Sequence, residues 1–285
     1  SMSLQLGIID ALPEKYRSEG VSLYSLFSTI PNLLGPLIAV GIWHVENMSI
    51  FAIVMIFIAV TTTLFGYRTT FANTQKEVSP KDEVLPFNAM TVYVQFFKNK
   101  ALFCSGMIMI LSSIVFGAMS TFIPLYTVRE GFANAGIFLT IQAITVVIAR
   151  FYLRKYVPSD GLWHHRFMMI VLTLLMVASV IVAFGPHIVS IFVYISAIFI
   201  GITQALVYPT LTTYLSFVLP KIGRNMLLGL FIACADLGIS LGGVLMGPIS
   251  DTVGFKWMYI LCALLVTIAM TLSKIRQRQS VSKAS

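Results

Sequence analysis

The chain has 285 residues, of which 58% are hydrophobic and only 11% are charged, and its mean hydropathy is +0.89. A soluble domain holds about 25% charged residues, so this composition excludes an ordinary water-soluble protein and indicates a chain whose solvent is lipid. The net charge of +8 does not indicate nucleic-acid binding, because Lys and Arg lie in short connections between apolar runs and not on one basic face among aromatics.

Eight apolar runs are each long enough to cross a hydrocarbon core of about 30 Å as a helix. They cover residues 20–43, 48–67, 101–126, 132–153, 167–185, 189–218, 226–249 and 256–274. Residues 1–11 are apolar but too short to span, which is typical of the end of a further helix. The sequence therefore predicts an all-α, polytopic protein that passes through the cell membrane many times.

The basic residues predict the orientation of these spans. Of the 19 Lys and Arg residues, only Arg129 and Lys256 lie in the connections HVEN, VREGFAN, FGPH and SDTVGFK. Cytoplasmic loops are enriched in Lys and Arg. The other connections, which hold the remaining Lys and Arg residues together with the C-terminus, are therefore expected to be cytoplasmic.

The longest connection, residues 68–100, is polar, charged and interrupted by Pro80 and Pro86. A segment of this kind is typical of a linker between two helix bundles. We therefore expect residues 1–67 to complete an N-terminal bundle, residues 68–100 to form a cytoplasmic linker, and residues 101–285 to form a six-helix C-terminal bundle.

Two stretches of the chain repeat one pattern. Leu-Pro is followed by Arg17 and then Gly35 in the first stretch, and by Arg224 and then Gly242 in the second, with equal spacings. The offset between the copies covers six spans, which indicates parallel repeats of six helices. The first copy is then incomplete, and the repeat predicts four further helices before residue 1.

Gly35, Pro36 and Gly41 form a small-residue, proline-kinked face in the first complete span, in the segment NLLGPLIAVG. This segment resembles the antiporter motif in the fifth helix of proton-coupled exporters of the major facilitator superfamily. Close helix packing without a coupling role explains the same residues. The glycine-rich seventh span and the following GPISDTVGFKW resemble the eleventh helix of that superfamily and its turn into the twelfth.

The basic cluster of Arg150 and Arg154 lies where the superfamily carries the second copy of its cytoplasmic Gly-Asp-Arg motif. The resemblance implies a fold of six plus six helices and secondary active transport by alternating access. Over residues 1–43 the chain is most similar to exporters of opine-type metallophores, which implies a small amino-polycarboxylate substrate, export across the cell membrane and coupling to protons. A multidrug/proton antiporter of the same superfamily and a membrane-embedded lipid-modifying enzyme are the alternatives.

Asp236 is the acidic residue that lies near the middle of a span, whereas the other Asp and Glu residues lie in loops or at span ends. An ionised carboxylate inside the membrane is costly, so it is expected to face a wet cavity or a partner. Asp236 is therefore a candidate for proton coupling or substrate binding, and a structural hydrogen bond to a neighbouring helix is the alternative.

Other polar side chains within the spans are candidates for lining a substrate cavity: Asn32, Tyr126, Gln142, Gln204, Tyr208 and Thr212. Each is more often an interhelical hydrogen bond than a ligand contact. His164 and His165 lie in a loop, with no carboxylate pair expected beside them, so no metal site is expected. The chain carries none of the common catalytic motifs of soluble enzymes, and neither an enzymatic activity nor a cofactor is expected.

Overall fold

The computed structural model describes residues 48–68, 94, 96–158, 160–187, 189–220 and 223–281. These residues fall into two units, which are described separately. The first expected span, 20–43, lies outside the described residues, as do Asn32, Gly35, Pro36 and Gly41.

One unit contributes the helix α3, Met48–Arg68, which coincides with the expected span 48–67. Its 21 residues give a length of roughly 32 Å at 1.5 Å per residue, which suffices to cross a hydrocarbon core. The hydroxyls of Thr61, Thr62 and Thr63 each donate to a carbonyl oxygen one turn earlier in the helix. These polar side chains are thus satisfied within the helix itself.

The other unit is a bundle of six long helices, each apolar and long enough to cross a membrane. They are α5 (Lys100–Glu130), α6 (Ala135–Leu153), α7 (His165–Ala183), α8 (Ser190–Val218), α9 (Arg224–Val253) and α10 (Phe255–Val281), with the short 3-10 turns η2 (Arg154–Tyr156) and η3 (Gly185–His187) after α6 and α7. Each helix matches one expected span. Helices α5, α9 and α10 continue beyond the apolar runs, because their polar ends keep helical hydrogen bonds where the apolar pattern stops.

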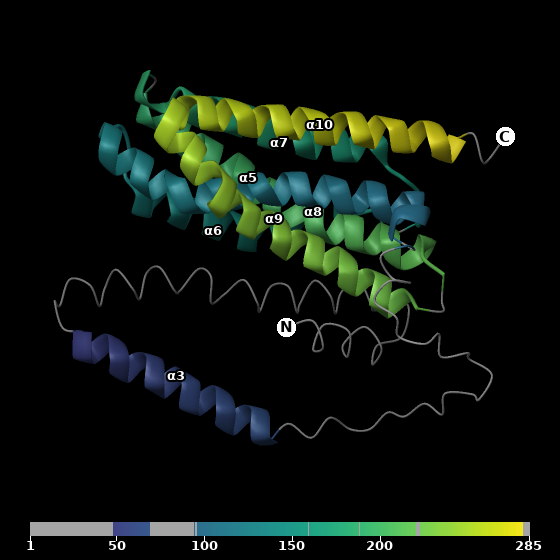
Figure 1. The fold of residues 1–285 in the computed structure, drawn as a ribbon, viewed down its shortest axis with the longest axis horizontal. Coiled ribbons are helices and arrows are strands. Elements are labelled where there is room, and N and C mark those ends of the chain that lie inside the picture. The colour runs from purple at the N-terminus through teal and green to yellow at the C-terminus, as the bar shows by residue number, and fades with distance from the viewer. Residues whose placement is uncertain are drawn as a thin grey trace. The chain divides into compact units, whose positions relative to one another are not determined.

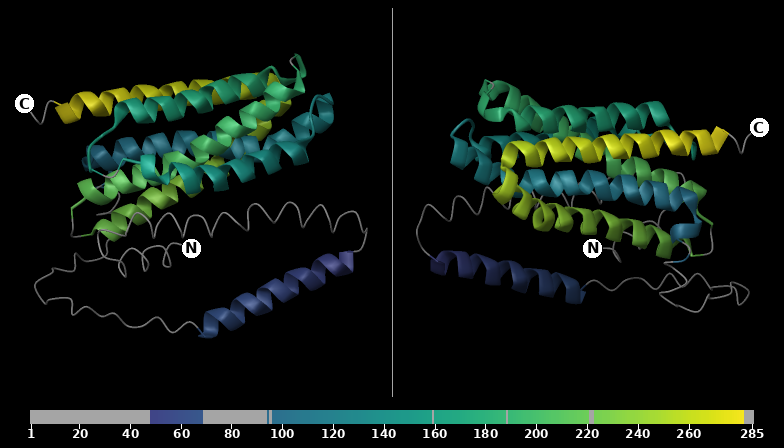
Figure 2. Two further views of the ribbon diagram at one scale, coloured as in Figure 1. Left: turned by 180° about the vertical axis from the view of Figure 1, so that it is seen from behind. Right: turned by 45° about the horizontal axis from the view of Figure 1, so that its top comes forward.

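Helix α5 occupies the centre of this bundle, and α9 and α10 pack against it. Helices α7 and α10 lie side by side, as do α6 and α8 (Figures 1 and 2). Of the most apolar stretch of α5, 83% is buried, against 22% for α6. Helix α5 is therefore the core of the bundle, whereas α6 lies at its edge.

Helices α5 and α9 approach each other at glycines. A Cβ atom on Gly117 would meet the carbonyl of Ile239, and a Cβ on Gly242 would meet that of Ile114. At Gly238, a Cβ would come within 2.7 Å of a third backbone oxygen. Small residues allow such close approach of helices in a membrane, so the glycines of the eleventh-helix resemblance serve packing against α5.

A single residue joins α9 to α10. Gly254 has φ +86°, a conformation that favours glycine. Its N–H donates to the Ser250 carbonyl over 3.1 Å, and its own carbonyl accepts from the N–H of Met258 over 3.2 Å. The turn is therefore continuous in hydrogen bonding with both helices.

Candidate functional site

A hydrogen bond between two amide side chains joins the membrane helices α6 and α8. Gln142 Nε2 donates to Gln204 Oε1 over 3.1 Å. Both residues lie near the middle of their helices, and Gly201 allows the close approach, because a Cβ there would come within 2.7 Å of the Gln142 carbonyl oxygen. The two amides predicted as cavity-lining candidates thus come together at mid-height of the bundle.

Gln142 is only 6% exposed, and its Oε1 atom meets no hydrogen-bond donor among the described residues. Leaving a buried acceptor unsatisfied costs about 1–3 kcal/mol. Such groups are uncommon in native proteins unless water, an ion or a ligand supplies the donor. The contact between α6 and α8 around Gln142, Gly201 and Gln204 is called the α6–α8 seam. It therefore holds a buried acceptor, Gln142 Oε1, for which the described side chains provide no donor.

Arg150 lies in the last turn of α6, within the expected span 132–153. Arg154 begins the turn η2. Arg150 is half-buried, and Tyr208 of α8 lies one turn after Gln204. The ring of Tyr208 in turn stacks on Phe231 of α9, with centroids 6.0 Å apart. A basic side chain of α6 and a phenolic side chain of α8 thus lie further along these helices than the two glutamines, towards the C-terminal end of each helix.

Asp236 lies in the middle of α9 and is exposed, on the face that points away from α5. Among the described residues, no hydrogen-bond donor or basic group contacts its carboxylate. Ser240, one turn later on the same exposed face, donates its hydroxyl to the Asp236 backbone carbonyl over 3.0 Å. Within the described ranges, no hydrogen bond joins Asp236 to either of the two glutamines.

Two other candidates lie in the packed interior. Tyr126 donates to the Ala183 carbonyl over 3.4 Å, and its ring lies 4.8–5.6 Å from those of Phe132, Phe255 and Tyr259. Thr212 is 4% exposed, and its hydroxyl donates to a carbonyl of its own helix. Both side chains already have partners within the bundle.

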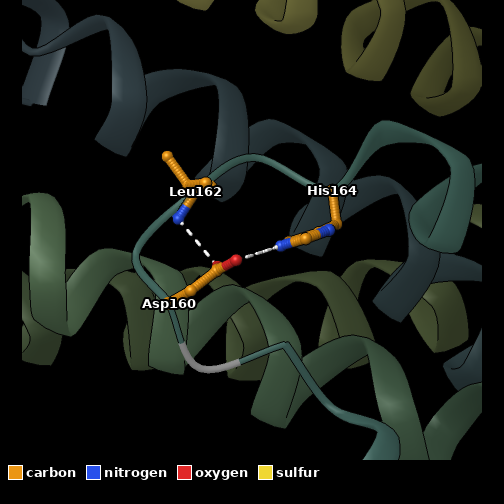
Figure 3. Close-up of polar contacts among 3 residues, drawn as sticks. All are labelled: Asp160, Leu162 and His164. Carbon is orange, nitrogen blue, oxygen red and sulfur yellow. Dashed lines mark hydrogen bonds and ion pairs between the residues drawn. The ribbon is translucent and has the colours of Figure 1, made fainter.

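The loop between α6 and α7 is organised by Asp160 (Figure 3). Its carboxylate accepts the backbone N–H of Leu162 over 3.0 Å and the His164 Nε2–H over 2.7 Å. These two contacts hold the pKa of the Asp160 carboxyl below its ordinary value. Because the Asp160 and His164 side chains are 48% and 41% exposed, the pair shapes the loop but contributes little stability.

Sequence reasoning missed a set of bonds that ties this loop to α8 and α10. Trp163 Nε1 donates to the Ser273 carbonyl over 3.1 Å. Arg276 donates to the Tyr214 hydroxyl through Nε over 3.1 Å and through Nη2 over 2.7 Å. The Trp163 and Tyr214 rings meet edge to face at 4.9 Å. A tryptophan, a tyrosine and an arginine at span ends are a weak signal, because nothing in the sequence pairs residues so far apart.

The described ranges contain no group of three or more His, Cys, Asp or Glu side chains that could hold a metal ion. His164 is engaged with Asp160, and His165 Nδ1 lies 3.2 Å from Ser273 Oγ. The two adjacent histidines thus contact different partners.

The sequence that forms this six-helix bundle matches the model of a known protein family. The family model of the Major Facilitator Superfamily matches residues 3–243 and, in a second overlapping match, residues 135–285. The chain belongs to the Major Facilitator Superfamily. Membership in this superfamily of transporters makes the chain a multi-pass membrane protein and not an enzyme, which removes the lipid-modifying alternative.

Relatives in the superfamily differ widely in similarity. The staphylopine export protein of Staphylococcus aureus strain Mu50 is 72% identical over 277 residues, which cover 97% of this chain and 70% of that protein. An uncharacterised transporter of the superfamily from Burkholderia mallei is 23% identical over 176 residues, which cover 61% of this chain and 42% of that protein. The first match extends over almost every residue described above.

Among solved structures, the E. coli fucose:proton symporter superposes on this chain with a TM-score of 0.65. The superposition covers 96% of this chain and 72% of the symporter, at 14% sequence identity. This likeness confirms the predicted fold class, a helical membrane protein of the major facilitator type. The four helices expected before residue 1 stay a prediction.

Proposed function

We propose that this chain belongs to a secondary transporter that exports staphylopine, or a closely similar opine-type metallophore, across the cell membrane. The observation that carries the proposal is the 72% identity, over 97% of the chain, to a staphylopine export protein. The positive charge and paired amides of the α6–α8 seam suit a small polar anion better than a hydrophobic drug. The proposal thus favours metallophore export over the multidrug alternative.

Transport by this fold proceeds by alternating access, in which helix bundles rock around a central site. We propose that residues 101–285 form the C-terminal bundle, residues 1–67 part of the N-terminal bundle, and residues 68–100 the cytoplasmic linker. The charge pattern supports a cytoplasmic C-terminus. Cysteines placed in the α6–α7 loop and after α10 would then react with an impermeant thiol reagent only from the inside.

Protons are the proposed driving ion, and Asp236 is the proposed carrier. A carboxylate at the centre of a membrane helix costs about 2.5–3.5 kcal/mol or more unless water or a partner reaches it. Asp236 has no such partner among the described residues and is exposed in the bundle, which supports a place in a water-filled cavity. A carboxylate there can bind a proton on one side of the membrane and release it on the other.

The test is export of staphylopine into the medium by cells that lack the gene and receive the complete gene on a plasmid. We expect the wild type to export staphylopine. Excess of a similar metallophore should reduce this export, whereas a hydrophobic cationic dye should not. Competition by the dye alone would favour the multidrug function instead.

Asp236→Asn is expected to reduce proton-driven export at least tenfold, because the amide cannot carry a proton. Ser240→Ala, on the same face one turn away, is the matched control and should export normally. Everted vesicles with an imposed proton gradient provide the measurement. Full export by Asp236→Asn at wild-type expression would refute the coupling role.

A further inference from the structure

The α6–α8 seam carries a pair of amides that is incomplete as it stands. Gln142 Nε2 donates to Gln204 Oε1, while Gln142 Oε1 is buried and has no donor among the described residues. The N–H groups of Gln204 Nε2 do not take part in this bond. The pair therefore offers an acceptor and donors side by side, which is the complement of an ammonium group next to a carboxylate.

The surroundings of the pair strengthen any polar contact made there. Val146, Ala149 and Ala205 form a small apolar cluster in the same seam. In such a medium, hydrogen bonds are electrostatically stronger than in water. The pair also lies near the middle of both helices, the depth at which transporters of this kind hold their substrates.

A second polar point lies along the same seam. Arg150 follows Gln142 by eight residues in α6, roughly 12 Å of helix at 1.5 Å per residue. Tyr208 follows Gln204 by one turn in α8, and its ring stacks on Phe231 of α9. Helices α6 and α8 contain no Asp or Glu, so the fixed charge along their seam is positive. A guanidinium provides the donors that a carboxylate prefers, and a phenol hydroxyl can add a further donor.

We propose that the α6–α8 seam binds the exported metallophore at two points, its amino-acid end at the Gln142–Gln204 pair and a second carboxylate at Arg150 and Tyr208. This inference rests on the proposed function and adds the recognition chemistry. The amide pair accepts from the ammonium through Gln142 and donates to the adjacent carboxylate through Gln204. A substrate that lacks either the amino-acid end or the second carboxylate loses one of the two points.

The experiment measures equilibrium binding of staphylopine to the transporter purified from its complete gene, by isothermal titration calorimetry. Gln142→Leu and Arg150→Gln are each expected to weaken binding about tenfold or more, which corresponds to one hydrogen bond to a charged group. Thr212→Val is the matched control, since the hydroxyl of Thr212 only bonds its own helix, and it should bind like the wild type. Arg150→Lys should recover part of the loss, because it keeps the charge but not the planar pair of donors.

Singly methyl-esterified forms of staphylopine separate the two points. For one ester, Arg150→Gln should cause no further loss while Gln142→Leu still does, because that ester has already lost the Arg150 contact. A purely structural role of Arg150 would weaken all esters alike and would overturn the assignment. Each variant must elute as a single species with a melting temperature near that of the wild type.

The two hypotheses fail in different ways. If the wild-type protein neither binds nor exports staphylopine, the proposed function is wrong. If the wild type binds it and both Gln142→Leu and Arg150→Gln bind it equally well, the function stands and the two-point site is wrong.

Discussion

Two seams of the bundle differ in what holds them together. At the α5–α9 seam, Gly117 and Gly242 bring backbone against backbone, and the contact lies in the buried centre of the bundle. At the α6–α8 seam, Gly201 again brings the helices close, but the amides of Gln142 and Gln204 bond across the contact. The α5–α9 contact requires only that the two backbones lie close together, whereas the α6–α8 contact also offers amide donors and acceptors. We interpret the α5–α9 seam as a fixed joint and the α6–α8 seam as a recognition surface.

The largest expected effect on stability comes from a substitution that forces α5 and α9 apart. Gly242→Leu would drive a side chain into the Ile114 carbonyl and to within 2.9 Å of the Ala118 backbone nitrogen. Backbone cannot move aside as a side chain can, so we expect a loss of about 3 kcal/mol or more and little folded protein. Fluorescence-detected size-exclusion chromatography of a fusion protein measures the folded fraction.

The neighbouring glycine provides the control for that variant. A Cβ on Gly243 would lie 3.7 Å from Thr121 Oγ1, an ordinary contact. Gly243→Ala should therefore elute like the wild type. Equal elution of Gly242→Leu and wild type would show that the α5–α9 joint is not fixed.

A smaller effect is expected at the recognition seam. In Gly201→Ala the new methyl group would lie 2.7 Å from the Gln142 carbonyl oxygen and 2.8 Å from Thr145 Cβ. The edge helix α6 can shift outwards more easily than the central α5, so we expect a loss of about 1–3 kcal/mol. Staphylopine binding should weaken as well, because the shift moves the Gln142 amide. A thermal melt and a titration on the same sample check both, and a lower melting temperature with unchanged affinity would separate the seam from the substrate.

The smallest expected effect comes from Ser113, a buried polar group that we do not expect to contact substrate, in contrast to Gln142. Ser113 lies at the α5–α9 seam, 0% exposed, and its hydroxyl has no partner among the described residues. Ser113→Ala removes an unsatisfied group, so we expect stability within about 1 kcal/mol of the wild type or slightly above it. Substrate binding should not change, in contrast to Gln142→Leu. Loss of binding in Ser113→Ala would extend the recognition surface to α5.

Much of the fold was predictable from the sequence, because twenty-residue apolar runs in lipid have to become helices. The pairing of side chains was not. Gln142 and Gln204 are 62 positions apart, and hydropathy does not reveal which faces of their helices meet. Tyr126 and Thr212 look identical to cavity residues in the sequence, since a polar side chain within a span either lines a cavity or bonds inside the core. Packing alone decides between the two.

Arg150 illustrates a different limit. The sequence groups Arg150 with Arg154 as one basic cluster, yet Arg150 lies in the last turn of α6 and Arg154 begins η2. The expected span 132–153 ends at the same residue as α6, so the sequence predicts that Arg150 is helical but not which side chains surround it. The orientation of the spans and the domain boundaries stay predictions.

The one-residue connection at Gly254 has a mechanical consequence. Because its N–H bonds to α9 and its carbonyl to α10, no loop separates the two helices and any change in the angle between them has to take place at Gly254 itself. At its far end, α10 is fastened to the α6–α7 loop through Ser273 and to α8 through Arg276. The two ends of α10 are thus held by different neighbours, by α9 through Gly254 at one end and by α8 and the α6–α7 loop at the other.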